Sequence, residues 1–304
     1  MHGVTVPLSA EEAATFPSLW NSYDAQFQKA VDGALRKEFK GQRAEAIKQK
    51  KVGIVVVDIT DLKHPKVAAY NPDKMMYAAS LPKIAILLGA AVMIDRGELV
   101  LNESLRASMT RMIRNSSNRD ATAILKMVGF ENLAEILQSE RYRLYDPAHN
   151  GGLWVGRPYA KGPVWRRDPL HGISHGATAM QVARFYYLGV TGRLVSEVML
   201  AEMRNIMSAP AIKHKFVKGL KQSNSDARIF RKSGTWRQFH SDSGVIIDDE
   251  AGYRYIIVSL ANHPDGADGL RRLAIAVDKA VKGMHPDKKA LEPIIDPETY
   301  PLPE

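Results

Sequence analysis

The chain has 304 residues, of which 45% are hydrophobic, and its formal net charge at pH 7 is +9. This length is enough for one large domain or two intertwined ones. The longest apolar run, Ile84 to Met93, is far shorter than the ~20 residues that span a bilayer, which excludes an integral membrane segment. The absence of cysteine excludes disulfides and thiolate chemistry. Basic residues are interspersed with acidic ones, which argues against nucleic-acid binding.

The first part of the chain predicts helices followed by a β-hairpin. A capping-box pattern at Ser9–Glu12 predicts a short helix, and apolar residues four apart from Tyr23 to Leu35 predict a longer one. The β-branched run from Lys51 to Thr60 predicts a strand, and a turn leads to a second strand from Lys66 to Tyr70. The chain therefore begins as one half of an α/β layer.

The middle of the chain is predicted to be mainly helical. Helices are expected over residues 80–97, 104–114, 119–128, 133–139, 177–188 and 196–207. The segment from Tyr142 to Ser174 is rich in glycine and proline and shows no periodicity. A loop of this length in a compact domain is usually functional, often a wall or lid of a site, although a solvated excursion is the alternative.

The last third of the chain predicts strands and a final helix. Strands are expected over residues 227–235, 240–247 and 253–260, followed by a helix with apolar residues from Leu270 to Val281 and a surface tail from His285. The predicted fold class is α/β, with an antiparallel sheet of about five strands flanked by N- and C-terminal helices, and an inserted all-helical lobe. The expected lobes are 1–75 plus 208–304 for the sheet and 76–207 for the helices, with an active site between them.

A candidate reaction centre lies where a buried helix is predicted to begin. Ser80 and Lys83 are three residues apart and would share one helix face, and Pro82 suits a first helical turn. In a partly dry site, an amine beside a hydroxyl can lose its proton and become the base that activates the serine. The alternative is that Ser80 only caps the helix and Lys83 is solvated.

Two further motifs lie at the ends of predicted helices and strands, where side chains of an active site are often found. Ser116-Ser117-Asn118 lies between two predicted helices, and Lys232-Ser233-Gly234-Thr235 ends a predicted strand. With Ser80-x-x-Lys83, these motifs occur in the order and context of the class A β-lactamases and penicillin-binding proteins. The chain resembles this superfamily from about Val52 to Val281.

The resemblance implies a role for each motif residue. Ser80 would attack a carbonyl and become acylated, with Lys83 as the nearby base. Ser116 would relay a proton to the leaving nitrogen, and Asn118 would hold Lys83 and the substrate amide. Lys232 would attract the substrate carboxylate and keep the relay hydroxyl easy to deprotonate.

The strand motif would bind the substrate backbone. Ser233, Gly234 and Thr235 would pair with it, with the glycine allowing close approach and the Ser233 hydroxyl replacing the threonine of the family. The backbone N–H groups of Ser80 and Thr235 would form the oxyanion hole. Arg237 is a candidate for binding a substrate carboxylate, with an exposed edge-strand arginine as the alternative.

The chain also departs from the pattern of the family. Ser117 replaces an aspartate, which should alter the support of its loop, and the interval between the first two motifs is short. Class A β-lactamases carry a loop glutamate that activates the deacylating water. Between Arg141 and Arg193 the only acids are Asp146 and Asp168, and Asp168 is expected to pair with arginine and brace the loop. The acyl-enzyme is therefore expected to persist, unless one of these aspartates replaces the glutamate.

These features predict a serine acyl-transfer hydrolase of the penicillin-recognising type, acting on β-lactams or D-Ala-D-Ala peptides. The alternatives are a turnover-competent β-lactamase, a sensor that is acylated without turnover, and a serine amidohydrolase with an unrelated substrate. No cofactor or metal is expected, because His171 and His175 lie in a glycine-rich loop without an apparent third ligand. We expect a monomer, and the resemblance implies export, although no signal peptide is visible.

Overall fold

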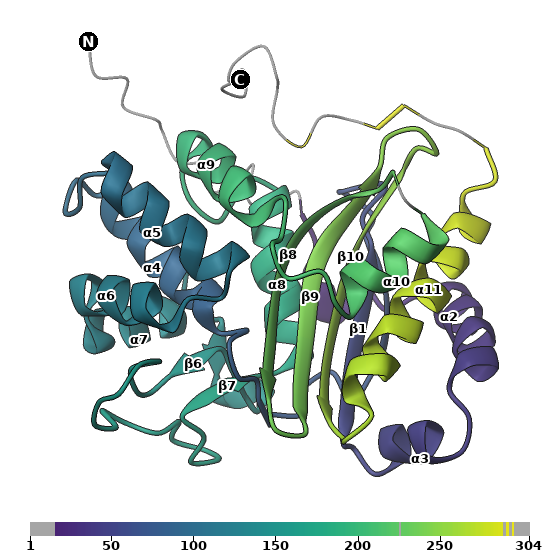
Figure 1. The fold of residues 1–304 in the computed structure, drawn as a ribbon. Coiled ribbons are helices and arrows are strands. Elements are labelled where there is room, and N and C mark those ends of the chain that lie inside the picture. The colour runs from purple at the N-terminus through teal and green to yellow at the C-terminus, as the bar shows by residue number, and fades with distance from the viewer. Residues whose placement is uncertain (1–15, 225, 288–289, 292–293, 295–304) are drawn as a thin grey trace.

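A five-stranded sheet forms the centre of the structure, a computed structural model that describes residues 16–224, 226–287, 290–291 and 294 (Figure 1). The strand order is β2-β1-β10-β9-β8, and each neighbouring pair is antiparallel. The bounds are β1 (Val52–Asp58), β2 (Lys66–Tyr70), β8 (Arg228–Trp236), β9 (Phe239–Asp248) and β10 (Tyr253–Asn262). The predicted fold class is confirmed, while the helix predicted at Ser9–Glu12 lies outside the described residues.

The sheet separates two hydrophobic cores, and β1 belongs to both. Its side chains alternate between the faces, so that Val55 and Val57 enter one core while Ile54 and Val56 enter the other. Every residue of β1 is buried, as the continuous β-branched run predicts for a central strand covered on both faces.

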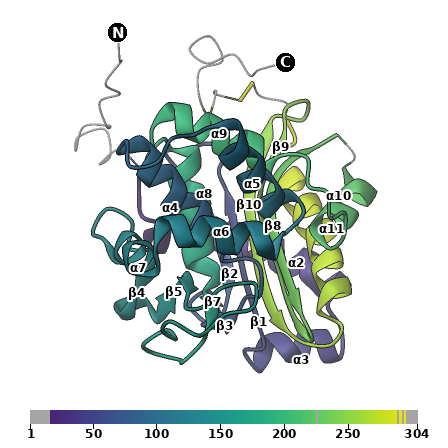
Figure 2. The ribbon, with the colours of Figure 1, turned by 60° about the vertical axis from the view of Figure 1, so that its left-hand side comes forward.

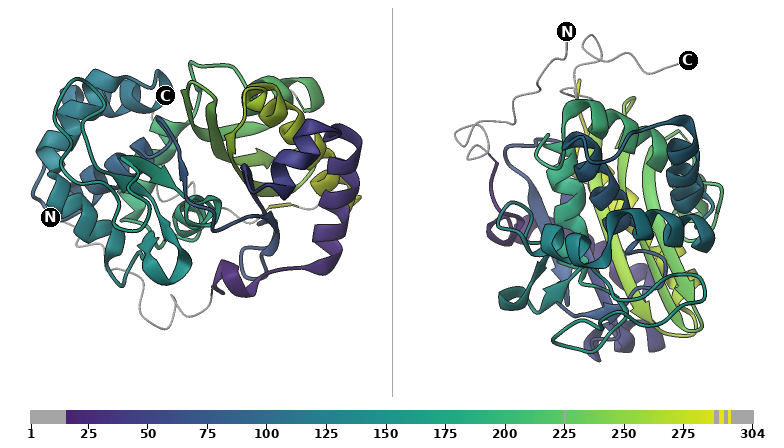
Figure 3. Two further views of the ribbon diagram at one scale, coloured as in Figure 1. Left: turned by 90° about the horizontal axis from the view of Figure 1, so that it is seen from below. Right: turned by 90° about the vertical axis from the view of Figure 1, so that its left-hand side faces the viewer.

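One face of the sheet is covered by helices from both ends of the chain. Figure 3 shows α2 and α11 side by side on this face, together with the shorter α3 and α10. The bounds are α2 (Ala25–Glu38), α3 (Gln42–Lys48), α10 (Phe216–Ser223) and α11 (Gly266–Met284). The stripe predicted for the longer of the two N-terminal helices is buried at Phe27, Val31 and Leu35, but Tyr23 precedes this helix and is 49% exposed. Neither α3 nor α10 was predicted from the sequence.

The other face carries the larger group of helices (Figure 2). Their bounds are α4 (Lys83–Asp95), α5 (Glu103–Arg114), α6 (Asn118–Val128), α7 (Phe130–Gln138), α8 (Ala179–Val190) and α9 (Glu197–Met207). The first ten residues of α4 are all buried, so this helix forms the centre of the group, whereas α8 packs on the sheet. Within the described ranges, no helix has both the length and the hydropathy to cross a membrane.

The inserted segment is not purely helical, because it also contains short strands. They are β3 (Met76–Tyr77), β4 (Tyr145–Asp146), β5 (Gly151–Gly152), β6 (Trp154–Val155) and β7 (His175–Ala177). Strand β7 lies between β3 and β6 and pairs with both. This small sheet joins the segment just before Ser80 to both ends of the long loop. The remaining elements are the single-turn helices η1 (Leu19–Asn21) and η2 (Pro147–His149).

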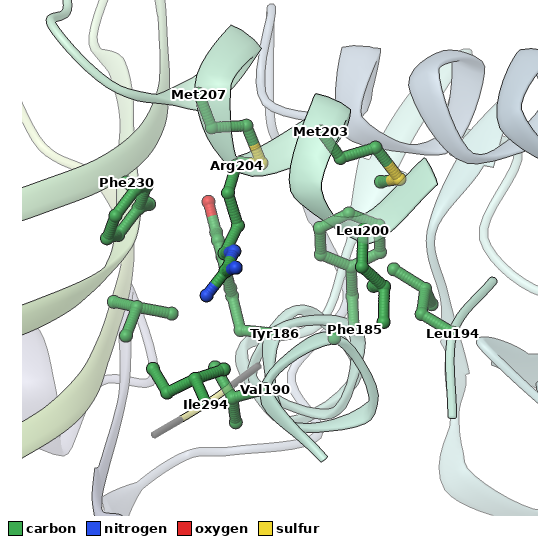
Figure 4. Close-up of a pocket in the computed structure, with 12 residues that line it drawn as sticks. Phe185, Tyr186, Val190, Leu194, Leu200, Met203, Arg204, Met207, Phe230 and Ile294 are labelled. Atoms are coloured by element: carbon green, nitrogen blue, oxygen red, sulfur yellow. The ribbon is translucent and has the colours of Figure 1, made fainter. Parts of the chain in front are cut away.

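A cavity lies between α8, α9 and the β8–β9 pair (Figure 4). Its lining is apolar except for Arg204, which extends among Tyr186, Met207 and Phe230. None of the sequence-predicted site residues lines this cavity. The candidate chemistry is therefore located by contacts among side chains and not by this cavity.

Candidate active site

The nucleophile candidate Ser80 lies in the turn that precedes α4. Pro82 is the residue at the helix cap, and α4 has no side-chain cap, so the alternative in which Ser80 caps the helix is wrong. The preceding residue, Ala79, has a left-handed backbone with φ of +52°. Among the described residues, none accepts a hydrogen bond from the backbone N–H of Ser80. This donor is therefore free for a substrate oxygen, as an oxyanion hole requires.

Lys83 occupies the first turn of α4 and is fully buried, which excludes the solvated alternative. Its Nζ lies 3.2 Å from Ser80 Oγ and 2.8 Å from Asn118 Oδ1. It also lies 2.5 Å from the carbonyl oxygen of Ser116 and 3.3 Å from the hydroxyl of that residue. Burial lowers the pKa of Lys83 to about 7, because an ammonium in this place has lost most of its hydration. A large fraction of the amine is therefore neutral near pH 7.

Ser116 connects the two lysines of the site. It has a left-handed backbone with φ of +58°, and Lys232 Nζ lies 3.0 Å from its hydroxyl. Burial, followed by the nearby charge of Lys83, holds the pKa of Lys232 well below its usual value. Ser117 caps α6 and donates to Asp120, so it supports the loop in place of the aspartate of the family. The hydrogen bonds thus join four side chains into one continuous chain, in the order Ser80, Lys83, Ser116 and Lys232.

Gly234 allows β8 to lie directly against the nucleophile turn. A Cβ atom at this position would stand 2.4 Å from the carbonyl oxygen of Ala78 and 2.6 Å from the backbone nitrogen of Ser80. Neither distance is sterically possible, so only glycine permits this approach. Because β8 is the last strand of the sheet, its outer edge can add a peptide-like substrate as a further strand.

A third buried lysine, which the sequence did not reveal, fixes the same strand from behind. Lys215 Nζ donates to the carbonyl oxygens of Gly234 (2.6 Å) and Ser241 (3.1 Å) and to the Thr235 hydroxyl (2.8 Å). Burial lowers the pKa of Lys215 to about 8. No local motif marks this residue, because its partners are two strands that follow it in the chain.

A buried ion pair stiffens β8 beside Lys232. Arg231 donates to both carboxylate oxygens of Asp242 at 2.7 and 2.8 Å, and both side chains are almost completely buried. Asp242 also accepts from the backbone N–H of Phe216 at 3.1 Å. The pair therefore joins β8, β9 and the start of α10 into one unit behind the site.

The long loop contributes Tyr159, a second residue that the sequence did not single out. The Nζ of Lys83 lies 4.6 Å from the centroid of its ring, and its hydroxyl donates to the carbonyl oxygen of Ala79 at 3.1 Å. The ring also packs against His175 at 4.2 Å between centroids. The loop thus forms a wall of the site, as its length suggested.

The two loop aspartates are engaged in structural contacts. Asp168 accepts from Tyr145 and from the backbone N–H groups of residues 170, 171 and 173, so the expected arginine partner is wrong although the loop-bracing role holds. Asp146 pairs with Arg143 at 2.6 Å and caps η2. Of the hydrogen bonds that these carboxylates make to described residues, none reaches Ser80 or Lys83.

The remaining candidates lie away from this hydrogen-bonded chain. Arg237 is exposed in the turn between β8 and β9, and its guanidinium lies 4.4 Å from the ring centroid of Trp236. His171 contacts Asn150, and His175 Nε2 lies 3.1 Å from the carbonyl oxygen of Arg157. In the described part of the chain, no three histidine or acidic side chains are grouped to hold a metal.

The comparison with protein families gives one match, and the solved structures give several. The family model Beta-lactamase2, described as the beta-lactamase enzyme family, matches residues 35–109 and 104–280. The structure of PBP-A superposes with a TM-score of 0.62 at 17% identity, over 79% of this chain and 95% of that chain. A mutant of PBP-A, in an acyl-enzyme complex with penicillin G, gives 0.63 at 16% identity, over 86% and 98%.

A β-lactamase from Sphaerobacter thermophilus DSM 20745 has the same fold. Its TM-score is 0.61 at 18% identity, over 85% of this chain and 98% of that chain. A comparison with curated proteins gave no match. Because the family model covers most of the sequence, the chain belongs to the β-lactamase enzyme family.

Proposed function

We propose that this protein is a serine hydrolase of the penicillin-recognising type whose acyl-enzyme forms on Ser80 and is released slowly. Its acyl donors are β-lactams or D-Ala-D-Ala-like peptides. The observation that carries the proposal is the hydrogen-bonded chain Ser80–Lys83–Ser116–Lys232, which joins a buried amine of lowered pKa to the nucleophile. Family membership supports a β-lactam-acting hydrolase but does not distinguish the two classes of donor.

Acylation proceeds through these groups. Neutral Lys83 takes the proton of Ser80 as the Ser80 Oγ–carbon bond forms, and the negative charge moves to the carbonyl oxygen, which the N–H groups of Ser80 and Thr235 bind. The bond between carbon and the leaving nitrogen then breaks. The proton reaches that nitrogen through the Ser116 hydroxyl, which lies between the two lysine amines.

Substrate placement follows from the strand and the charges around it. The backbone of the acyl donor pairs with the outer edge of β8 at Ser233–Thr235. The carboxylate of the donor lies near Lys232, because the Nζ of this residue is 3.0 Å from the Ser116 hydroxyl that passes on the proton. Arg237 would reach this carboxylate only after leaving the face of Trp236.

Release of the acyl group needs a water molecule and a base to take its proton. The two carboxylates of the long loop are held by Tyr145, Arg143 and backbone N–H groups. Deacylation therefore lacks the carboxylate base that class A β-lactamases use. Each ~1.4 kcal/mol missing from the stabilisation of the transition state slows release about tenfold, so the adduct accumulates.

Intact-mass spectrometry after incubation with penicillin G tests this proposal. We expect the wild type to gain the mass of one penicillin and to keep it for hours, and Ser80→Ala to gain none. Ser117→Ala is the matched control, because it removes a neighbouring hydroxyl that contacts Asp120 and not Lys83. Disappearance of the drug without an adduct would instead show a turnover-competent β-lactamase.

The same measurement with an acyl-D-Ala-D-Ala peptide separates the remaining alternatives. Release of D-alanine supports a peptidase, whereas a stoichiometric penicillin adduct without any hydrolysis identifies a sensor. If neither compound reacts, the proposal fails, and a serine amidohydrolase with an unrelated substrate becomes the better hypothesis. Export, a monomeric state and the division into lobes 1–75 plus 208–304 and 76–207 stay predictions.

A further inference from the structure

Tyr159 is the contact between the long loop and the reaction centre. Its hydroxyl donates to the carbonyl oxygen of Ala79 at 3.1 Å, and its ring faces the Nζ of Lys83 at 4.6 Å. One side chain thus contacts both the turn that holds the nucleophile and the base that activates it. Neither contact belongs to the three sequence motifs.

The hydroxyl contact acts on a strained part of the backbone. Ala79 has φ of +52°, a left-handed conformation that a non-glycine residue keeps only where its surroundings hold it. Two hydroxyl groups from distant parts of the chain hold this turn. Tyr159 donates to the carbonyl oxygen of Ala79, and Ser241 donates to that of Ala78 at 2.8 Å. The next residue is Ser80, so these bonds set the direction of its N–H and its side chain.

The ring contact acts on the solvation of Lys83. The aromatic face lies against the amine and takes a place that water would otherwise fill, and burial is the cause of the lowered pKa of Lys83. His175 packs against the ring at 4.2 Å between centroids and is itself buried. The next loop residue, Ala160, donates to the hydroxyl of Thr122 on α6 at 2.8 Å. The packing of His175 and the hydrogen bond of the neighbouring residue therefore hold the ring in place.

We propose that Tyr159 is a positioning residue with two separable effects on the acyl-enzyme cycle. Its hydroxyl holds the Ala79 turn so that Ser80 is aligned for acylation. Its ring keeps water away from Lys83 and from the ester that forms on Ser80, which prolongs the life of the adduct. The inference rests on the proposed function, because it describes two steps of that cycle.

Two variants separate these effects. Tyr159→Phe keeps the ring and loses the hydroxyl, so we expect acylation by penicillin G to slow about threefold to tenfold, the range for one lost hydrogen bond, with an unchanged adduct lifetime. Tyr159→Ser removes the ring, so we expect the adduct lifetime to fall at least about tenfold as water enters. Intact-mass time courses of adduct formation and decay measure both quantities.

Tyr142→Phe is the matched control. The Tyr142 hydroxyl is buried and donates to the carbonyl oxygen of Leu194 at 2.8 Å, so this variant loses a comparable hydrogen bond far from Ser80 in the contact network. We expect its acylation rate and adduct lifetime to equal those of the wild type. If Tyr159 had only a structural role, both phenylalanine variants would lose stability, and their acylation rates would be equal. That result, or a wild-type adduct lifetime in Tyr159→Ser, overturns the inference.

A second reagent makes the test independent of penicillin recognition. Phenylmethanesulfonyl fluoride reacts with an activated serine, forming an Oγ–sulfur bond and releasing fluoride while Lys83 takes the proton. We expect Tyr159→Phe to slow this labelling relative to Tyr142→Phe. If the wild type is sulfonylated but acylated neither by penicillin G nor by the acyl-D-Ala-D-Ala peptide, the proposed function fails, and the labelling rate of Tyr159→Phe still decides the alignment effect. If the wild type reacts with neither reagent, Ser80 is not activated and both proposals fall.

Discussion

Lys83 makes the pH dependence of acylation a direct test of the base. Only the neutral amine can take a proton from Ser80, so the rate must rise with pH as Lys83 loses its proton. With its pKa lowered to about 7 by burial, we expect the second-order rate of acylation to rise roughly tenfold between pH 6 and pH 8 and then level off. Stopped-flow or quenched mass measurements with penicillin G give this profile.

Three other titratable groups lie near Lys83, namely Tyr159, His175 and Lys232, and they would leave different profiles. Burial holds the pKa of Tyr159 well above its usual value, so this hydroxyl keeps its proton across the range. Burial lowers the pKa of His175 to about 4, so this ring is already neutral across the range. Lys232 approaches from β8 with its pKa well below the usual value, and loss of its charge would lower the rate at high pH. A rate that is flat from pH 6 to pH 8 would contradict the assignment of Lys83 as the base.

Single site residues were predictable where a sequence motif specifies both the residue types and their order along the chain. Ser80, Lys83, Ser116 and Lys232 were predicted in this way, and the structure brings them together. Tyr159 could not be predicted, because its contacts with the Ser80 turn depend on how a long loop without periodicity folds back. For the same reason the sequence indicated an arginine partner for Asp168, whereas the loop supplies backbone N–H groups and a tyrosine hydroxyl.

At the scale of elements, the placement of β8 against the Ser80 turn depends on one missing side chain. Gly234→Ala places a methyl group where Ala78 and Ser80 backbone atoms already lie, so β8 must move away from the turn. A displacement of about 1 Å in a catalytic site can cost a factor of about 100, and we expect acylation to fall by at least this amount. Adduct formation over time measures the loss.

The control for this variant is Gly269→Ala in α11. A Cβ atom at Gly269 meets nothing within 4 Å, and alanine is the better helix former, so we expect unchanged acylation and a stability gain of about 0.5–1 kcal/mol. Wild-type acylation by Gly234→Ala would show that β8 does not need this close approach.

Lys215 gives a second prediction for the same strand. Lys215→Met removes three hydrogen bonds that end on Gly234, Thr235 and Ser241, while its unbranched side chain fills much of the same space. We expect slower acylation by about one to two orders of magnitude, because the Thr235 N–H is less well aligned. Rescue by Lys215→Arg would support the alignment role, whereas equal rates in Lys215→Met and the wild type would refute it.

Elements were predicted best where hydrophobic periodicity is strong. The second strand has the predicted bounds, Lys66–Tyr70, and the central strand differs only at its ends. The short helix α10 was missed because its stability comes from packing on α11, where a Cβ atom at Gly219 would stand 2.3 Å from the carbonyl oxygen of Arg271. Phe216 and Leu220 are one helical turn apart and both buried, but one such apolar pair in an eight-residue segment is too little to predict a helix from the sequence.

At the scale of the whole molecule, the shared central strand predicts cooperative unfolding. Leu87 of α4 belongs to the core on one face of the sheet and Leu273 of α11 to the core on the other. Each change to alanine should cost about 2–5 kcal/mol of stability. Because β1 contributes side chains to both cores, we expect each variant to unfold in a single transition at a lower temperature.

Differential scanning calorimetry measures the number and the temperatures of the unfolding transitions of these two variants, with the wild type and Gly269→Ala as references. Two separated transitions, of which each variant shifts only one, would show that the sheet lobe and the helical lobe unfold independently.

The fold class was predictable at this scale because strands at both chain ends with helices between them leave few possible arrangements.

The pairing of β1 with β10 also determines when the chain can fold during synthesis. Val52 lies opposite Ala261, so the centre of the sheet joins segments separated by most of the polypeptide. Until β10 leaves the ribosome, β1 has no partner on that side, and neither core can close. Such non-local pairing makes folding slow, because a large loop must be ordered before the contacts that reward it form. The sheet of the nascent protein therefore stays incomplete until most of the chain has been synthesised, and its apolar strands are open to chaperone binding until then.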